Sequence, residues 1–277
     1  MKRCLMLVLL WTSLLPAALR AGANDWQDLF AKGLDAFKTP HGSWVAVASV
    51  QMDAKNPRKL LAQEGSGVYY NGPKGRSKDL YTKEKYADLE VHLEFLIPKG
   101  SNSGIKLHGH YEIQIEDSFG LKNPKGSDCG GVYPRAEAKP RYHHIDDGIA
   151  PKVNACKPAG QWQTLDIVFL APRFDKNGKK TANARLPKVL LNGIVIHDNV
   201  ELLTPTGDRW RGPEMAEGPL MLQGDHGPVA FRNLRIRRVP PGGLSASVQF
   251  RISHRGHREH RESKSPAFLV GLPYHCC

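Results

Sequence analysis

The sequence predicts an all-β protein, an antiparallel β-sandwich or barrel. Three observations lead to this fold class. Several short segments alternate apolar and polar residues with a period of two, Gly, Pro and Asn separate these segments, and helical periodicity is scarce. No rhythm of strand, helix and strand is visible, which argues against a parallel sheet. The chain has 277 residues, enough for one large domain or two small ones.

The elements follow in chain order. Residues 26–37 are expected to hold a turn or two of helix, broken at Gly33. All later elements are expected to be strands: one at 88–98, two at 104–117 that meet in a turn at Gly109, one at 162–172, a hairpin at 188–199 with the turn Asn192-Gly193, and two at 218–239 around a Gly224–Gly227 loop. The Asn-Gly pair tolerates the positive φ angles of a type I′ turn. The long loop at 117–161 is of the length that is usually functional or partly disordered.

The first 23 residues are predicted to be an export signal. Lys2 and Arg3 precede an apolar run from Leu5 to Leu15, Pro16 ends the run, and residues 21–23 offer a small-residue cleavage site. The run is shorter than the roughly 20 residues that a membrane-spanning helix needs. We therefore expect a secreted or periplasmic protein with no membrane association after cleavage, and an uncleaved anchor is the alternative.

Export changes the interpretation of the cysteines. Cys4 leaves with the signal, and Cys276 and Cys277 lie in the C-terminal tail, so Cys129 and Cys156 remain as a pair. In an oxidising compartment two such residues are expected to form a disulfide. The alternatives are two unrelated thiols or part of a metal site. The lack of a CxxC spacing argues against the metal site.

Charge is unevenly distributed. The formal net charge is +12, of which residues 1–23 and residues 242–277 each carry +3. The body between them has no Lys/Arg stripe interleaved with aromatic residues, so no nucleic acid partner is expected. Residues 242–277, rich in Arg and His, are interpreted as a disordered extension, with a basic arm for an anionic surface as the alternative. The expected domain is therefore residues 24–241.

The strand at 111–116 has an unusual polar face. One face is apolar, and the other carries Glu112, Gln114 and Glu116. A Gln between two acids supplies donors and acceptors for sugar hydroxyls, whereas the alternative is a solvated sheet face. At a rise of ~3.4 Å per residue the two acids lie about 13 Å apart. Glycosidase pairs lie about 5–5.5 or 6.5–9.5 Å apart, so a simple two-carboxylate hydrolase fits this strand badly.

Other residues are candidates for the same site. Asn102 opens a strand and can reach a ligand hydroxyl or cap a turn, and Asp117 can be a site carboxylate or a turn acceptor. His226 titrates near neutrality and lies in a Gly-flanked loop. The remaining candidates are polar or aromatic residues of loops and strand ends, each with a plain structural alternative: Gln223, Asp225, Tyr133, Arg135, Tyr142, His143, His144 and Trp162.

Several motifs and their order give a resemblance. They are Asn102-Ser103-Gly104, Glu112-x-Gln114, Gln223–Gly227 and Phe231–Asn233, within a match over roughly residues 65–239. Together they resemble the 3-keto-disaccharide hydrolase domain family. The resemblance implies a concanavalin A-like jelly-roll sandwich and activity on glycosides that already carry a ketone at C3. The sequence has no Gly-rich phosphate loop and no GxSxG or HExxH motif, so no cofactor or metal is expected, and a role for calcium is left open.

The implied chemistry removes the need for a carboxylate pair. A 3-ketone acidifies the C2 hydrogen, one base removes it, the C1 leaving group departs, and water adds to the enone. On the motif positions we place Glu112 as the base, Gln114 and Asn102 as ligands of hydroxyls or of the enolate oxygen, and His226 or Asp117 as the acid. Substrate contacts are assigned to these amides and to Gln223, Asp225 and Arg135. A non-catalytic carbohydrate-binding module and an ordinary glucanase are the alternatives.

Overall fold

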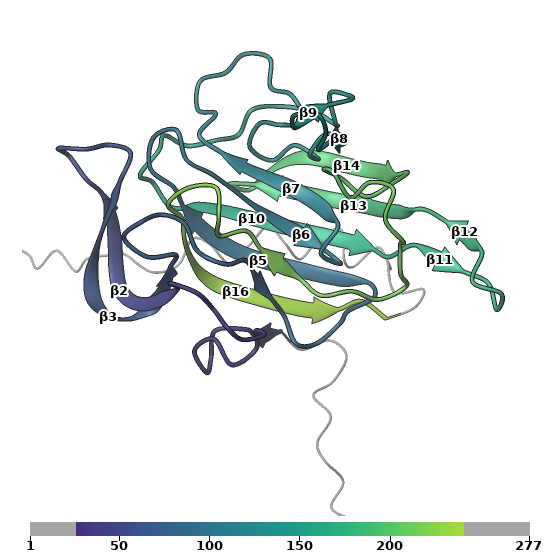
Figure 1. Cartoon of the computed structure of the whole chain (residues 1–277), viewed down its shortest axis with the longest axis horizontal. Coiled ribbons are helices and arrows are strands. Elements are labelled where there is room, and N and C mark those ends of the chain that lie inside the picture. The colour runs from purple at the N-terminus through teal and green to yellow at the C-terminus, as the bar shows by residue number, and fades with distance from the viewer. Residues whose placement is uncertain (1–25, 241–277) are drawn as a thin grey trace, which may run out of the picture. The chain divides into compact units, whose positions relative to one another are not determined.

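Sixteen strands and no helix make up residues 26–240, the part of the chain that the computed structural model describes. The predicted export signal (1–23) and tail (242–277) lie outside the described residues. Within residues 26–240 no helix is long and apolar enough to cross a membrane. The two main sheets are antiparallel throughout and stack as the layers of a jelly-roll sandwich, as predicted (Figure 1).

The large sheet forms one layer. Its spatial order is β14 (Ile194–Leu202), β13 (Ala184–Leu191), β10 (Gln163–Leu170), β5 (Leu89–Leu96), β16 (Ala230–Arg238), β3 (Leu60–Tyr70) and β2 (Val45–Met52), with β1 (Gln27–Asp28) paired to β16. β5 and β10 are its central strands, and both show the apolar alternation that the sequence predicts.

The small sheet lies in front of the large one in Figure 1. Its order is β4 (Leu80–Tyr81), β15 (Met221–Leu222), β6 (Asn102–Leu107) and β7 (Tyr111–Glu116). Short two-stranded ribbons complete the fold: β8 (Ala136–Glu137) pairs with β9 (His143–His144), and β11 (Arg173–Phe174) pairs with β12 (Lys180–Ala182).

One hydrophobic core joins the two layers. Leu93 and Phe95 of β5, Ile167 of β10, and Ile113 and Ile115 of β7 all belong to it and are at most 1% exposed. Fully burying side chains of this size contributes about 1.5–3 kcal/mol each. The apolar face of β7 is thus committed to the core, which turns the face with Glu112 and Gln114 away from it.

Two turns take the form that the sequence predicts. Asn192 and Gly193 have φ angles of +54° and +80°, as a type I′ hairpin requires. The β6–β7 turn places His108 and Gly109 at +54° and +70°. This turn sets the register in which β6 and β7 face each other.

The helix expected at 26–37 is absent, and that prediction is wrong. After β1 the chain forms successive turns, in which Gly33 N–H donates to the Phe30 carbonyl and Phe37 N–H to that of Leu34. Gly33 has a φ of +68°, which interrupts helical geometry.

The two cysteines that are expected to form a disulfide lie in contact. Cys129 and Cys156 are both buried and both free. A hydrogen bond between the two thiols, together with burial, raises the pKa of Cys129. The two cysteines that the sequence pairs therefore meet in the fold, and the disulfide between them stays a prediction.

Candidate active site

The facing polar side chains of β6 and β7 form the floor of the site. The hairpin register places Lys106 opposite Glu112, Gly104 opposite Gln114, and Asn102 opposite Glu116. Because opposite residues point to the same face, all these polar groups gather on the side away from the core. The carboxylate, amides and ammonium group of the site thus come from a single β-hairpin.

A buried ion pair is the central feature of this floor. Lys106 Nζ lies 3.1 Å from Glu112 Oε2, and the Glu112 side chain is only 3% exposed. Burial raises the pKa of Glu112, and the nearby Lys106 lowers it without cancelling the rise. Burial lowers the pKa of Lys106, but the pairing with Glu112 outweighs this, so its pKa lies above the ordinary value. Lys106 is therefore a fixed cation beside a carboxylate that can take up a proton.

Gly104 makes room for the Glu112 carboxylate. A Cβ built on Gly104 would lie 2.3 Å from Glu112 Oε1, closer than real contacts allow. Gly104 lies within β6 and not in a turn, so the glycine is required by space and not by backbone conformation.

Replacing Gly104 by alanine is expected to displace the Glu112 carboxylate and separate it from Lys106. We expect kcat/KM for the glycoside substrate to fall by about 10²-fold, because a small misplacement of a carboxylate that takes part in a reaction has effects of this size. Steady-state kinetics with a thermal unfolding curve measure this. Gly67→Ala is the control for a backbone effect, since Gly67 has a positive φ but a Cβ built on it would meet nothing within 4 Å. Unchanged kinetics in Gly104→Ala would contradict the packing argument.

Glu116 orients the amides beside the ion pair. Its Oε2 accepts hydrogen bonds from Asn102 Nδ2 over 2.7 Å and from Gln114 Nε2 over 3.2 Å. With its NH₂ group engaged, Gln114 directs its carbonyl oxygen elsewhere, and that buried oxygen has no partner among the described residues. The buried Gln223 Oε1 likewise has none within residues 26–240. Two unpaired acceptors at one site suit the hydroxyl donors of a sugar.

These groups open into a polar pocket of about 410 Å³. Its walls combine all four strands of the small sheet with the loops around them. The lining residues are Asp79, Tyr81, Asn102, Lys106, Gly109, His110, Glu112, Gln114, Tyr133, Tyr142, Thr206, Gly207, Asp208, Arg209, Met221, Gln223, Asp225 and His226. The volume is that of a small-molecule site.

A buried asparagine fixes the loop that carries His226. Asn71 donates to the carbonyls of Gly224 and Gly227 and accepts from Val229 N–H over 3.0 Å. Asp79 Oδ1 accepts from Gly224 N–H over 2.9 Å. The loop backbone is held at both ends, whereas the His226 side chain is 55% exposed and bonded through Nδ1 to Asp225.

Six predicted site residues meet in the pocket, and two do not. Asn102, Glu112, Gln114, Gln223, Asp225 and His226 all line it. Asp117 does not: its carboxylate accepts from Gly100 N–H over 2.9 Å, which is the turn role. Arg135 does not either, because its guanidinium pairs with Asp146 at 2.6 Å and stacks on Trp210. Both residues lie near a sequence motif, which made them candidates for the site. The alternation of strand faces directs Asp117 away from the pocket, and the pairing of Arg135 with Asp146 within the loop does the same for Arg135.

Several lining residues are not among those predicted from the sequence. Lys106 was detectable, because pairing the two strands around the Gly109 turn places it opposite Glu112. His110 lies in the β6–β7 turn next to Gly109, so it was detectable in the same way. Asp79, Tyr81 and Arg209 come from segments without any distinguishing pattern, and long-range folding alone brings them here. Of the aromatic candidates, Tyr133 and Tyr142 line the pocket, and Trp162 instead stacks with Arg232 outside it.

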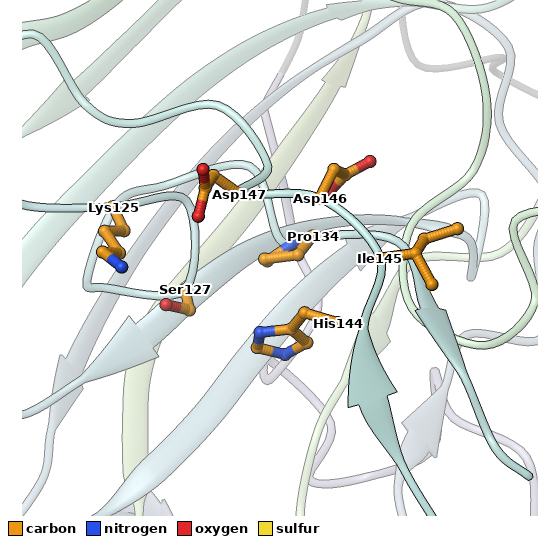
Figure 2. A pocket seen from close by; sticks show the side chains of 7 residues that line it. All are labelled: Lys125, Ser127, Pro134, His144, Ile145, Asp146 and Asp147. Atoms are coloured by element: carbon orange, nitrogen blue, oxygen red, sulfur yellow. The ribbon is translucent and has the colours of Figure 1, made fainter.

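A second hollow lies on the long loop beside the pocket (Figure 2). It has a volume of about 350 Å³ and is lined by Lys125, Ser127, Pro134, His144, Ile145, Asp146 and Asp147. His144 connects the two hollows, because its Nε2 lies 2.9 Å from the hydroxyl of Tyr133 in the pocket wall. Within residues 26–240 no group of three or more His, Cys, Asp or Glu side chains is arranged to hold a metal ion.

A jelly-roll sandwich with a pocket of carboxylates, amides and phenol rings defines a class, that of glycosidase-like, carbohydrate-active proteins. Comparison with family models gives the particular family. The chain belongs to the family of the 3-keto-alpha-glucoside-1,2-lyase-like domain, whose model matches residues 25–237. This confirms the family that the sequence motifs resemble.

Solved structures share the fold. Two crystal structures from Parabacteroides distasonis ATCC 8503, both of proteins provisionally named glycosyl hydrolases, are similar to this chain. One is 24% identical over 74% of this chain and 84% of its own, with a TM-score of 0.50. The other is 21% identical over 78% of this chain and 100% of its own, with a TM-score of 0.51. No curated protein matches the chain.

Proposed function

We propose that this protein is an exported enzyme that cleaves glycosides carrying a ketone at C3, by proton abstraction at C2, elimination and hydration. The observation that carries the proposal is the Lys106–Glu112 pair in the floor of the pocket. Elimination from a 3-keto sugar needs a base at C2 and a positive group for the enolate oxygen. This pair supplies both within one hairpin.

Each half of the pair has a distinct task. Glu112 removes the C2 proton, and the C–H electron pair moves into an enolate on the C3 oxygen. The Lys106 ammonium group stabilises that oxygen, because a fixed charge in a partly dry site acts strongly on developing charge. The enolate then expels the C1 oxygen, and water adds at C1. The unpaired oxygens of Gln114 and Gln223 accept from sugar hydroxyls and so fix the ring against the base.

The direct test compares oxidised and parent sugars. The purified protein is incubated with both anomers of a nitrophenyl 3-keto-glucoside and with the matching glucosides. We expect only the ketones to be cleaved, and the substrate deuterated at C2 to react more slowly. Cleavage of the parent glucosides at equal rates would contradict the proposal, and binding of the ketones without any cleavage would favour a non-catalytic module.

An ordinary two-carboxylate glycosidase is the competing function. Asp79 lines the same pocket as Glu112, and burial raises its pKa. Two carboxyl groups with raised pKa values are the kind of pair that such enzymes use. The deuterated substrate separates the two functions, because direct displacement at C1 breaks no C2–H bond.

The pH dependence of kcat/KM is expected to report the base. A base must be deprotonated, so activity should rise with pH through the pKa of Glu112, which lies above its usual value of 4.5. Lys106 lowers that pKa. In Lys106→Met the rising limb should therefore move to higher pH. Profiles of kcat/KM for both proteins measure the shift, and an unmoved limb would exclude Glu112 as the titrating base.

A further inference from the structure

Three side chains form a hydrogen-bonded chain from the pocket wall to the second hollow. Tyr133 and Tyr142 line the pocket, and His144 lines the hollow of Figure 2. Tyr142 donates to the Tyr133 hydroxyl over 3.4 Å, and His144 Nε2 lies 2.9 Å from the same oxygen. The proposed function assigns no role to this chain of groups.

Tyr133 is fixed beside the proposed base. Its N–H donates to the Glu112 carbonyl over 3.1 Å, and the neighbouring Val132 forms a β-bridge with Ile113 of β7. Burial raises the pKa of Tyr133, and the charge of Glu112 adds to the rise while the bond from Tyr142 opposes it. The phenol thus carries its proton at neutral pH and borders the same space as Glu112.

In one tautomer of His144 the hydrogen bonds leave the Tyr133 proton free. When His144 carries its proton on Nε2, the Tyr133 oxygen accepts from both His144 and Tyr142. Its own O–H is then available to a ligand in the pocket. The same two donors stabilise the phenolate once the proton has left, as charge-assisted bonds do. His144 is exposed to solvent.

We propose that Tyr133 is the acid that protonates the leaving-group oxygen, with His144 and Tyr142 stabilising the phenolate. This inference rests on the proposed function. In the elimination, the C2 proton passes to Glu112, the C1–O bond breaks, and the departing oxygen takes the Tyr133 proton. In the hydration, the phenolate takes a proton from the water that attacks C1, and Glu112 returns its proton to C2. Both groups end as they began, and the net change is addition of one water across the glycosidic bond.

The test varies the leaving group. Tyr133→Phe is assayed on a 3-keto-disaccharide and on 3-keto-glucosides of phenol, 4-nitrophenol and 2,4-dinitrophenol. A sugar alkoxide needs an acid and a dinitrophenolate does not. The measured rate is the first-turnover release of the leaving group, which precedes hydration. We expect a loss of about 10²–10⁴-fold on the disaccharide, near-normal release of dinitrophenolate, and a steeper dependence of this rate on leaving-group acidity than in the unmodified protein.

His144→Asn supplies a second variant for the case in which Tyr133→Phe does not fold, because His144 is exposed. It should show a smaller loss with the same selectivity for poor leaving groups. His143→Asn is the matched control with normal rates, since the exposed His143 bonds through its side chain to the Arg141 carbonyl and lines neither hollow. An equal loss on all substrates, or none, would overturn the role of Tyr133. Selective loss in His226→Asn instead would assign the acid to His226.

The test of Tyr133 and the test of the proposed function can fail independently of each other. If the unmodified protein cleaves only oxidised sugars and shows the C2 isotope effect, elimination stands whatever Tyr133→Phe does. If it shows neither, the proposed function fails before the acid is tested.

Discussion

Replacing Glu112 by glutamine is expected to lower kcat/KM on a 3-keto-glucoside by about 10²–10⁴-fold, the usual contribution of a positioned base. Glutamine keeps the shape of the side chain and an oxygen that can accept from Lys106, so the pocket should keep its form. Because the change removes proton abstraction and not binding, the loss should fall on kcat more than on KM. Steady-state kinetics, with thermal unfolding as a check on folding, measure this.

Asp117→Asn is the comparison that separates the sequence hypothesis from the structure. The sequence motifs place Asp117 in the catalytic set, whereas the structure gives its carboxylate a turn hydrogen bond outside the pocket. We expect this variant to cleave at the normal rate with a modest loss of stability. A folded Glu112→Gln protein with normal kcat would remove Glu112 from the reaction.

Lys106→Met is expected to reduce both stability and activity. The Glu112 side chain would be left charged and 3% exposed without its partner, and breaking a buried pair in this way costs about 3–5 kcal/mol. Loss of the group that stabilises the enolate should lower kcat by about 10²–10³-fold. Denaturant unfolding and kinetics at pH 7 measure the two effects.

The pH response of that variant has a definite sign. The folded-state pKa of Glu112 is already raised, and it should rise further without Lys106. A carboxyl group with a raised folded pKa stabilises the fold in its protonated form and loses that contribution as pH rises through the folded pKa. The stability deficit of Lys106→Met should therefore be smaller at pH 5 than at pH 8.

A double variant and a surface control complete this experiment. Glu112→Gln combined with Lys106→Met should be more stable than Lys106→Met alone, because no buried charge remains. Lys152→Met breaks a pair with Asp198 in which both side chains are more than half exposed, and such pairs contribute about 0–1 kcal/mol. Additive losses in the double variant would show that the pair does not act as a unit.

The fold was predictable because it depends on alternation that is visible locally. The apolar positions of β5, β7 and β10 could be assigned from period-two patterns, and the Asn192-Gly193 turn from its two residue types. The segment at 26–37 forms turns for a local reason as well, because Gly33, with a φ of +68°, interrupts a composition that favours a helix. The bonding state of Cys129 and Cys156 is a chemical property that their positions do not determine.

The site was predictable only where it lies within one hairpin or one glycine-flanked loop. Glu112, Gln114 and His226 could be found because their neighbours carry a pattern. Asp79 and Arg209 could not, since they reach the pocket through strand order and loop pairing between distant segments. Arg135 is the opposite case: it was predicted to contact the substrate, but its side chain pairs with Asp146 and does not face the pocket.

The residues that line the pocket lie partly on core-packed strands and partly on loops. Lys106, Glu112 and Gln114 stand on strands packed into the core, whereas Tyr142, Arg209 and His226 stand on loops. Relatives with the same hairpin but different loops should therefore perform one reaction on different aglycones. Transplanting residues 203–217 between them is a route to new substrate scope that leaves the reacting groups in place.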